Sequence, residues 1–220
     1  MTERDEMTSA PQKEREKLGI LRTFLRSALM VVFFTVVLGL IYPALVNVVG
    51  STLFPDQAAG SLVRNDKGEV VGSKLLGEDW TDTGLFEGRP SATGEKPYNP
   101  MATSGSNYAQ SNPDLEKAVK ERAERWQKMT GSDKPVPMEL LTASASGLDP
   151  QISLAGALYE VPWVAKSTGL SGAELEALVR SVAKKDLLAF GGDPLVNVLE
   201  LNLKVLEITK KIPHQKPQEK

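Results

Sequence analysis

Cysteine is absent from the sequence, and histidine occurs once, at His214. A chain without cysteine forms no disulfide, offers no thiolate nucleophile and holds no cysteine-ligated zinc or iron–sulfur site. His214 lies in a polar tail between Pro213 and Pro217, where we expect the imidazole to be in solvent. The sequence therefore contains no cluster of histidines and carboxylates that would predict a metal site.

Motifs for phosphate binding and for nucleophilic catalysis are also missing. The chain has neither a G-x-x-x-x-G-K-[ST] loop nor a strand-associated G-x-G-x-x-G. One S-x-x-K match, Ser181 to Lys184, falls inside a predicted helix and lacks its companion motifs. The Ser-rich segment Leu141–Pro150 has no base nearby, which favours tight backbone packing over a hydrolase centre. We therefore expect a chain that is not an enzyme by itself.

The charge balance gives no sign of a nucleic-acid partner. The net charge is −2 and the pI is about 5.6, so the chain lacks the basic surface that nucleic acids require. Hydrophobic residues make up 41% and charged residues 25%, as in ordinary globular proteins. At 220 residues, the chain has room for one membrane anchor and one domain of ordinary size.

One uncharged stretch is the strongest signal in the sequence. No Asp, Glu, Lys, Arg or His occurs from Ser27 to Pro55. A helix from Ala28 to Val49 would be about 33 Å long, enough to cross a hydrocarbon core about 30 Å thick. The alternative is a cleaved signal peptide, but the stretch is too long for its apolar region and no small-x-small cleavage site closes it. We predict an uncleaved transmembrane helix at 25–50.

The flanking charges predict the orientation of this helix. Basic residues precede it closely, at Lys13, Arg15, Lys17, Arg22 and Arg26. Only Arg64 and Lys67 follow it within a comparable distance. Because basic residues favour the cytoplasmic side, we expect the N-terminus in the cytoplasm and the rest of the chain outside.

Three residues in the span indicate a partner helix. Thr35 and Gly39 form a small-xxx-small pair, which lets another helix approach closely. Pro43 removes a backbone hydrogen bond, so we expect a kink or a packing contact there.

Four segments follow from these observations. We expect a disordered cytoplasmic tail at 1–24, the transmembrane helix at 25–50, a mixed α+β extracytoplasmic domain at 51–210 and a polar tail at 211–220. Short apolar runs at Ser61–Arg64, Glu69–Gly72 and Leu85–Phe86 predict strands, with a hairpin turn at Asp66-Lys67-Gly68. The stretch Arg89–Pro113 is almost all turn residues, and a loop of that length is usually functional or bound to a partner.

Two helices in the domain have clear boundaries. Asn112 and Pro113 begin the first, its apolar face carries Leu115, Val119, Trp126 and Met129, and Gly131 ends it. The second begins at Ser171, which forms a capping box with Glu174. Ile152–Leu158 predicts a shorter helix that Pro162 closes. The segment 195–208 has features of both helix and strand, and we favour helix.

A series of motifs then resembles one family. They are FEGRPSAT (Phe86–Thr93), YNP (Tyr98–Pro100), SGSN (Ser104–Asn107), SNP (Ser111–Pro113), LTASASGLDP (Leu141–Pro150) and VNVLELNL (Val196–Leu203). Their order behind a single span resembles the C subunit of the bacterial potassium-transporting ATPase, the KdpC family. The resemblance covers about residues 25–206, nearly everything except the two tails.

The resemblance implies an accessory subunit of an ATP-driven, high-affinity potassium importer in the bacterial cytoplasmic membrane. It implies three partners: a P-type pump subunit that hydrolyses ATP through a phosphorylated aspartate, a channel-like potassium-binding subunit and a small single-span subunit. The family is described as a catalytic chaperone that raises the ATP affinity of the pump subunit. This chain lacks the D-K-T-G-T motif of a pump subunit, which agrees with a non-catalytic role.

The predicted topology conflicts with direct ATP binding, because ATP is cytoplasmic and the domain is expected outside. The family's proposed nucleotide segment corresponds to Leu170–Leu175, where the capping box already explains Ser171 and Glu174. Relatives can carry Gln where this chain has Glu174, and a carboxylate repels phosphate. We therefore expect ATP affinity to change through the assembly, by a shift between pump conformations.

Two further residues depart from the family pattern. Glu160 and Trp163 stand where the pattern has Gln and Arg, so an interface involving that arginine would differ here. An exposed Trp163 would serve as an apolar anchor.

We expect contacts with the partner subunits in the span, the long loop and the Ser-rich segment. The candidates are Thr35, Gly39, Pro43, Arg89, Pro90, Tyr98, Asn99, Ser104, Asn107, Ser144, Ser146 and Asp149. An anchored binding or sensor module unrelated to transport is the alternative. A hydrolase that depends on Ser144, Ser146 or Ser181 is a weaker one.

Overall fold

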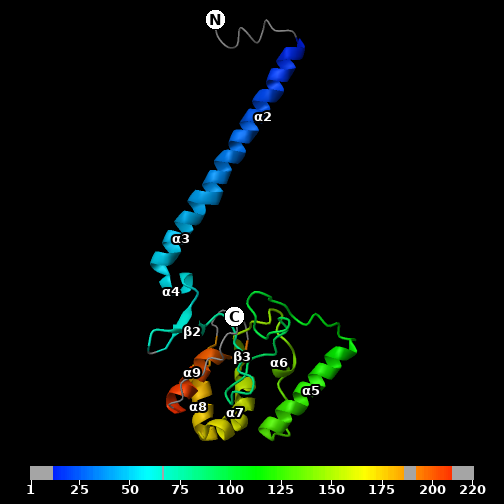
Figure 1. The fold of residues 1–220 in the computed structure, drawn as a ribbon, viewed down its shortest axis with the longest axis vertical. Coiled ribbons are helices and arrows are strands. Elements are labelled where there is room, and N and C mark those ends of the chain that lie inside the picture. The colour runs from blue at the N-terminus through cyan, green and yellow to red at the C-terminus, as the bar shows by residue number, and fades with distance from the viewer. Residues whose placement is uncertain (1–11, 66, 186–191, 210–220) are drawn as a thin grey trace. The chain divides into compact units, whose positions relative to one another are not determined.

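The computed structural model describes residues 12–65, 67–185 and 192–209. The chain divides into two compact units, Met1–Ala59 and Gly60–Lys220 (Figure 1). The predictions for the ends of the two tails, and for His214, concern residues outside the described ranges.

The first unit is a helix that contains the predicted span. Helix α2 (Gln12–Val36), the π-helical turn η1 (Val37–Ile41) and helix α3 (Tyr42–Leu53) follow one another without a break, and the short α4 (Pro55–Ala58) comes next. Within it, Gly19–Leu53 is long and apolar enough to cross a membrane, with a mean hydropathy of 2.6. The helix begins at Gln12, so the prediction of disorder over 1–24 was wrong for residues 12–24.

Pro43 lies two residues after the end of the π turn at Ile41. In this turn the Tyr42 N–H donates to the Val37 carbonyl, five residues back. Pro43 itself occupies the first turn of α3 and has no N–H to donate. The wider turn therefore sits where proline changes the helical hydrogen bonding, and such π bulges are frequent at functional positions.

The second unit begins with the predicted hairpin. Strands β1 (Leu62–Arg64) and β2 (Val70–Ser73) pair antiparallel, with an irregularity between Val63 and Arg64. The Asn65 side chain accepts hydrogen bonds from the N–H groups of Lys67 and Glu69, both at 3.0 Å, and so closes the turn. The hairpin is confirmed, and Asp66 lies outside the described residues.

Helix α5 (Pro113–Thr130) has the predicted boundaries. The Asn112 side chain accepts the Asp114 N–H at 2.8 Å, and Gly131 ends the helix in the left-handed conformation, at φ 65°. The short helix α6 (Met138–Leu141) follows and buries Leu140 and Leu141.

The remaining elements enclose the core. Strands β3 (Gln151–Ser153) and β4 (Leu195–Asn197) pair antiparallel, and helices α7 (Leu154–Thr168), α8 (Gly172–Val182) and α9 (Val198–Thr209) pack around them. Fully buried core side chains come from all of these elements: Ile152, Val164, Leu175, Val179, Val196, Leu201 and Val205. A mixed helix-and-strand domain is therefore confirmed.

Three local predictions are corrected. Ile152 belongs to β3, and α7 continues through Pro162 to Thr168, because its packing against α5 and α8 outweighs the one hydrogen bond that proline removes. Leu85–Phe86 is irregular rather than a strand. The segment 195–208 contains both structures, since Asn197 ends β4 and its side chain accepts the Glu200 N–H at 3.0 Å to begin α9.

Candidate functional site

The long loop and the Ser-rich segment lie against each other. Between them, the Ser144 N–H donates to the Pro90 carbonyl and the Ser104 N–H to the Ser146 carbonyl, both at 3.1 Å. We call this region, residues 88–107 and 142–149, the loop junction. Its backbone has no helix or strand, so side chains and single backbone hydrogen bonds hold it together.

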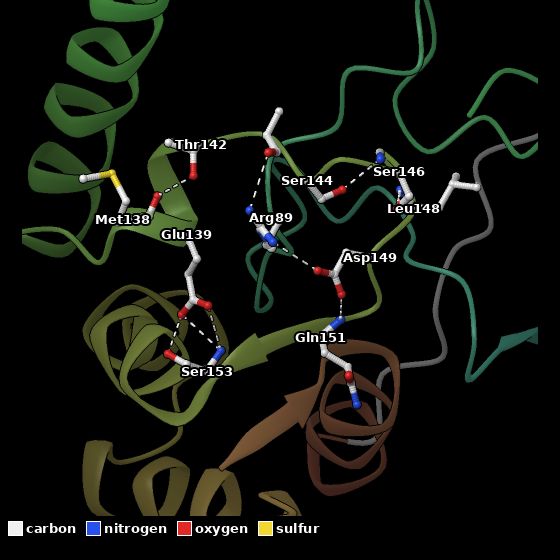
Figure 2. Close-up of polar contacts among 12 residues, drawn as sticks. Arg89, Met138, Glu139, Thr142, Ser144, Ser146, Leu148, Asp149, Gln151 and Ser153 are labelled. Atoms are coloured by element: carbon white, nitrogen blue, oxygen red, sulfur yellow. Dashed lines mark hydrogen bonds and ion pairs between the residues drawn. The ribbon is translucent and has the colours of Figure 1, made fainter. Parts of the chain in front are cut away.

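Arg89 joins the two halves of the loop junction. Its guanidinium donates to the Ala143 carbonyl at 3.5 Å and contacts the Asp149 carboxylate at 3.3 Å, and Figure 2 shows the Arg89 side chain directed at Asp149. Asp149 also accepts the Gln151 N–H at 3.0 Å, which ties the junction to the start of β3. The Tyr98 hydroxyl donates to the Arg89 carbonyl at 2.6 Å.

Two hydroxyls that the motif analysis did not single out organise the loop. Ser91 Oγ accepts the Tyr98 N–H at 2.8 Å and donates to the Gly147 carbonyl at 2.8 Å. Thr93 Oγ1 accepts the Asn99 N–H at 3.0 Å and is almost fully buried. Both belong to the GRPSAT motif, so the motif itself was the available signal. Tyr98 and Asn99 are thereby fixed through their backbone.

The hydroxyls of the two serines in the Ser-rich segment make hydrogen bonds within that segment. Ser144 Oγ is buried and accepts the Gly147 N–H at 2.8 Å, while Ser146 Oγ accepts the Leu148 N–H at 3.1 Å (Figure 2). Both hydroxyls thus shape a turn, in agreement with tight backbone packing.

Gly147 makes the close approach between the two halves feasible. Its φ is +68°, in the region that favours glycine. A Cβ added there would overlap the Thr93 methyl group and lie 2.7 Å from the Ser104 carbonyl oxygen. The glycine of TASASG therefore has both a conformational and a packing role.

Tyr98 is held as a hydrogen-bond donor. Burial, together with the nearby carboxylates of Asp79 and Asp149, raises the pKa of its phenol above the usual value. The hydroxyl thus keeps its proton and its bond to the Arg89 carbonyl.

The outer face of the loop remains open. Met101 is 91% exposed, Tyr108 is exposed, and Asn107 is exposed with a positive φ of 52°. An exposed rim of mixed polar and apolar character is a surface that another protein could contact.

A buried acidic pair lies where the FEGRPSAT segment enters the loop junction. Arg125 of α5 donates to both carboxylate oxygens of Glu87, at 2.8 and 2.7 Å. Glu160 of α7 has no exposed surface, and its Oε2 accepts the Glu87 N–H at 2.7 Å. Burial is the main cause that raises the pKa of Glu160 well above its usual value. Sequence alone does not reveal this pair, because its members are far apart in the chain.

Trp163 is half-buried rather than exposed. Its ring packs against the core and lines a groove with Asp82, Glu121, Arg125 and Lys166, and its indole nitrogen is buried. The prediction of an exposed apolar anchor at this position was therefore wrong.

Ser171 and Glu174 form the predicted capping box at the start of α8. Ser171 Oγ accepts the Glu174 N–H at 3.2 Å, and the Glu174 carboxylate accepts the Ser171 N–H at 3.0 Å. These hydrogen bonds lower the pKa of Glu174, so the carboxylate is ionised at neutral pH. A negative charge therefore occupies the helix end that would otherwise suit a phosphate.

Two of the three anchor candidates, Thr35 and Gly39, lie along one shallow groove, and Pro43 lies outside it. Thr35 and Gly39 line it with Met30, Val31, Phe34 and Leu38, and Thr35 Oγ1 donates back to the Val31 carbonyl at 2.7 Å. The hydroxyl is thus satisfied within the helix, which leaves an apolar surface for a neighbour. Over the described residues, no group of histidines and carboxylates is placed to hold a metal.

Comparison with known proteins identifies the family. The family profile described as "KdpC: K+-transporting ATPase, c chain" matches residues 24–207. The chain belongs to the KdpC family. It is therefore a potassium-pump accessory subunit, and this membership replaces the alternative of a sensor module unrelated to transport.

Individual relatives are similar in sequence to this chain over most of their length. The "Potassium-transporting ATPase KdpC subunit" of Pectobacterium atrosepticum is 46% identical over 191 residues, 86% of this chain and 99% of the relative. The protein of the same name from Herpetosiphon aurantiacus is 45% identical, over 86% of this chain and 98% of the relative. That from Yersinia enterocolitica is also 45% identical, over 82% of this chain and 91% of the relative. The loop junction and the anchor groove both lie within the range matched by the KdpC family.

Proposed function

We propose that this KdpC-family chain stabilises the potassium pump complex and raises the ATP affinity of its ATP-hydrolysing subunit, without an active site of its own. Its partners are that P-type pump subunit, the channel-like potassium-binding subunit and the small single-span subunit. The chain lies in the bacterial inner membrane, with its N-terminus in the cytoplasm and its domain outside. The charge asymmetry around the span supports this orientation.

The observation that carries the proposal is the construction of the loop junction. The polar side chains that could serve a reaction are already hydrogen-bonded to the backbone within it, from Ser91 and Thr93 to Ser144 and Ser146. Such a loop loses little conformational entropy when a partner binds, which favours a stable interface. The anchor groove adds a second contact, within the membrane.

ATP is bound by the partner pump subunit, and this chain acts on it by coupling. Glu174 is ionised and hydrogen-bonded to Ser171, so the start of α8 repels a phosphate instead of binding one. A chain that binds one pump conformation more tightly than another shifts their populations and thereby changes the apparent ATP affinity.

Affinity purification after detergent solubilisation tests the assembly. The pump and channel subunits should be recovered with a tagged form of this chain. Recovery of the chain alone would contradict the proposal. Deletion of the chain should also abolish growth at micromolar-range potassium.

The KM for ATP tests the coupling. The pump subunit without this chain should show a higher KM, and adding the chain should lower it. Glu174→Gln separates coupling from direct contact, because it removes a charge but keeps a side chain that can accept the capping hydrogen bond. Coupling predicts an unchanged KM in this variant. A lower KM would show that nucleotide phosphate meets α8 directly.

A further inference from the structure

Glu160 is a buried carboxyl without a cation of its own. Its side chain has no exposed surface, and among the described residues no ion pair reaches it. Oε2 accepts the Glu87 N–H at 2.7 Å, whereas Oε1 is buried without a hydrogen-bond partner. A negative charge in such a place is far more costly than a neutral carboxyl group.

Arg125, the cation whose charge favours ionisation of Glu160, is already paired with other carboxylates. Arg125 donates two hydrogen bonds to Glu87, and Asp82 lies 3.6 Å from the same guanidinium. The charge of Arg125 is therefore balanced by two carboxylates other than Glu160. Glu87 is moreover an anion close to Glu160, so ionisation of Glu160 would place two like charges together.

Other elements around Glu160 add no compensating charge. Glu139 of α6 acts on it as a further anion, and Tyr98 of the loop is a neutral phenol. Helix α8 packs against α7 with the apolar residues Leu175, Val179 and Val182, and strands β3 and β4 contribute Ile152 and Val196 to the same core. Within the described part of the chain, the contacts that favour a charged Glu160 are the Glu87 N–H and the more distant charge of Arg125.

We propose that Glu160 holds a proton in the folded domain and acts as a proton-dependent lock between α7 and the Phe86–Glu87 segment. With the proton present, a neutral carboxyl group accepts the Glu87 N–H and the segment stays packed. When the proton is lost, the buried charge requires water, and the packing around this segment opens. The segment leads directly into the loop junction, so the lock controls how the proposed interface is supported, independently of the coupling to ATP.

The direction of the pH effect follows from linkage. The carboxyl of an unfolded chain titrates near pH 4.3, and burial raises the folded-state pKa above that value. The folded state therefore binds more protons between the two pKa values. In that range the unfolding equilibrium constant rises with pH, by up to about tenfold per pH unit for one carboxyl.

Glu78 must be separated from Glu160 in the experiment. Burial raises the pKa of Glu78 from 4.5 to about 7, so this residue also makes stability fall as the pH rises. We therefore use Glu78→Gln as the reference protein, because this substitution removes the contribution of Glu78 and keeps that of Glu160.

Urea unfolding of the full chain in detergent micelles tests the lock, with tryptophan fluorescence as the signal. In the reference protein, the unfolding constant should rise steadily with pH above about pH 5. Adding Glu160→Gln should flatten this rise, because the amide accepts the same N–H but carries no charge. Adding Glu176→Gln, at an exposed position of α8, should leave the rise unchanged. If the unfolding constant rose equally steeply with pH in the presence and absence of Glu160→Gln, the proposal would be overturned.

Infrared spectroscopy decides the question even if Glu160→Gln does not fold. In the reference protein, the carbonyl stretch of a protonated carboxylic acid should persist as the pH rises beyond the range near pH 4 in which ordinary carboxyl groups ionise. Absence of this band in the folded reference protein would overturn the proposal.

Discussion

Gly147 shows how one residue can decide whether the loop junction forms. Thr93 and Ser104 approach its Cα so closely that no side chain fits between them. Its positive φ adds a second restriction, because other residues adopt that conformation at a cost. The two requirements are separable, since Gly169 at the end of α7 has a positive φ of 77° but open space around it.

Gly147→Ala should destabilise the domain by about 2–4 kcal/mol, from overpacking and backbone strain together. Gly169→Ala should lower the stability of the domain by only about 1 kcal/mol, since it introduces backbone strain without a steric overlap. Urea unfolding of the two variants measures the difference. Equal losses would mean that the junction relaxes around the added methyl group.

The Asn202 side chain makes the two backbone hydrogen bonds that a neighbouring strand would usually make with a buried segment. Its side-chain oxygen accepts the Phe86 N–H at 3.0 Å, and its nitrogen donates to the Phe86 carbonyl at 2.8 Å. Both residues are completely buried. An irregular segment is thus kept in the core, because one amide satisfies both backbone groups.

Asn202→Leu keeps the volume but leaves both Phe86 groups without partners. We expect a loss of about 2–6 kcal/mol, from about 1–3 kcal/mol for each buried unsatisfied group. Lys204→Ala, at an exposed position of the same helix, should stay within about 0.5 kcal/mol of the original. A loss below about 1 kcal/mol for Asn202→Leu would show that water reaches Phe86.

At the scale of elements, the sequence predicts those features whose causes are local. The caps of α5 and α8 were predicted correctly, because the residues that make them lie within four positions of one another. The continuation of α7 through Pro162 and the irregular path of Leu85–Phe86 were not. Both depend on packing between segments distant in the chain.

The candidate site likewise has features that the sequence predicts and features that it does not. The motifs singled out the loop and the Ser-rich segment, and the structure places these two segments together. The links among Arg89, Asp149 and Ala143, and the burial of Glu160, could not be foreseen, because they span more than fifty positions of the chain. The motifs single out candidate residues without showing what each residue contacts.

The groove on the anchor helix makes a separate prediction. Gly39→Leu would fill it, and recovery of the channel-like subunit in a pull-down should fall about tenfold, as expected for a loss of about 1–2 kcal/mol. Ala44→Leu introduces the same side chain outside the groove and should leave recovery unchanged. If both variants copurify normally, the groove faces lipid.

At the scale of the whole molecule, the chain joins an apolar helix to an α+β domain. The basic residues that precede the span predict on which side of the membrane that domain lies. This orientation is central to the proposed function, because it decides whether the domain can meet cytoplasmic ATP.

The absence of cysteine permits a direct test of orientation. Lys120→Cys places a single thiol at an exposed position of α5, and Thr8→Cys places one before the anchor. In intact spheroplasts, a membrane-impermeant maleimide should label Lys120→Cys, and Thr8→Cys only after lysis. The opposite pattern would reverse the topology and reopen direct contact with ATP.

The bond pair between Asn202 and Phe86 also sets an order of events during synthesis. The two residues are 116 positions apart, so Phe86 leaves the ribosome long before its partner exists. Contacts of such long range form late, because a large loop must close first. The FEGRPSAT segment therefore cannot complete its packing until α9 has been synthesised, and a chain truncated before α9 would lack the support of its loop junction.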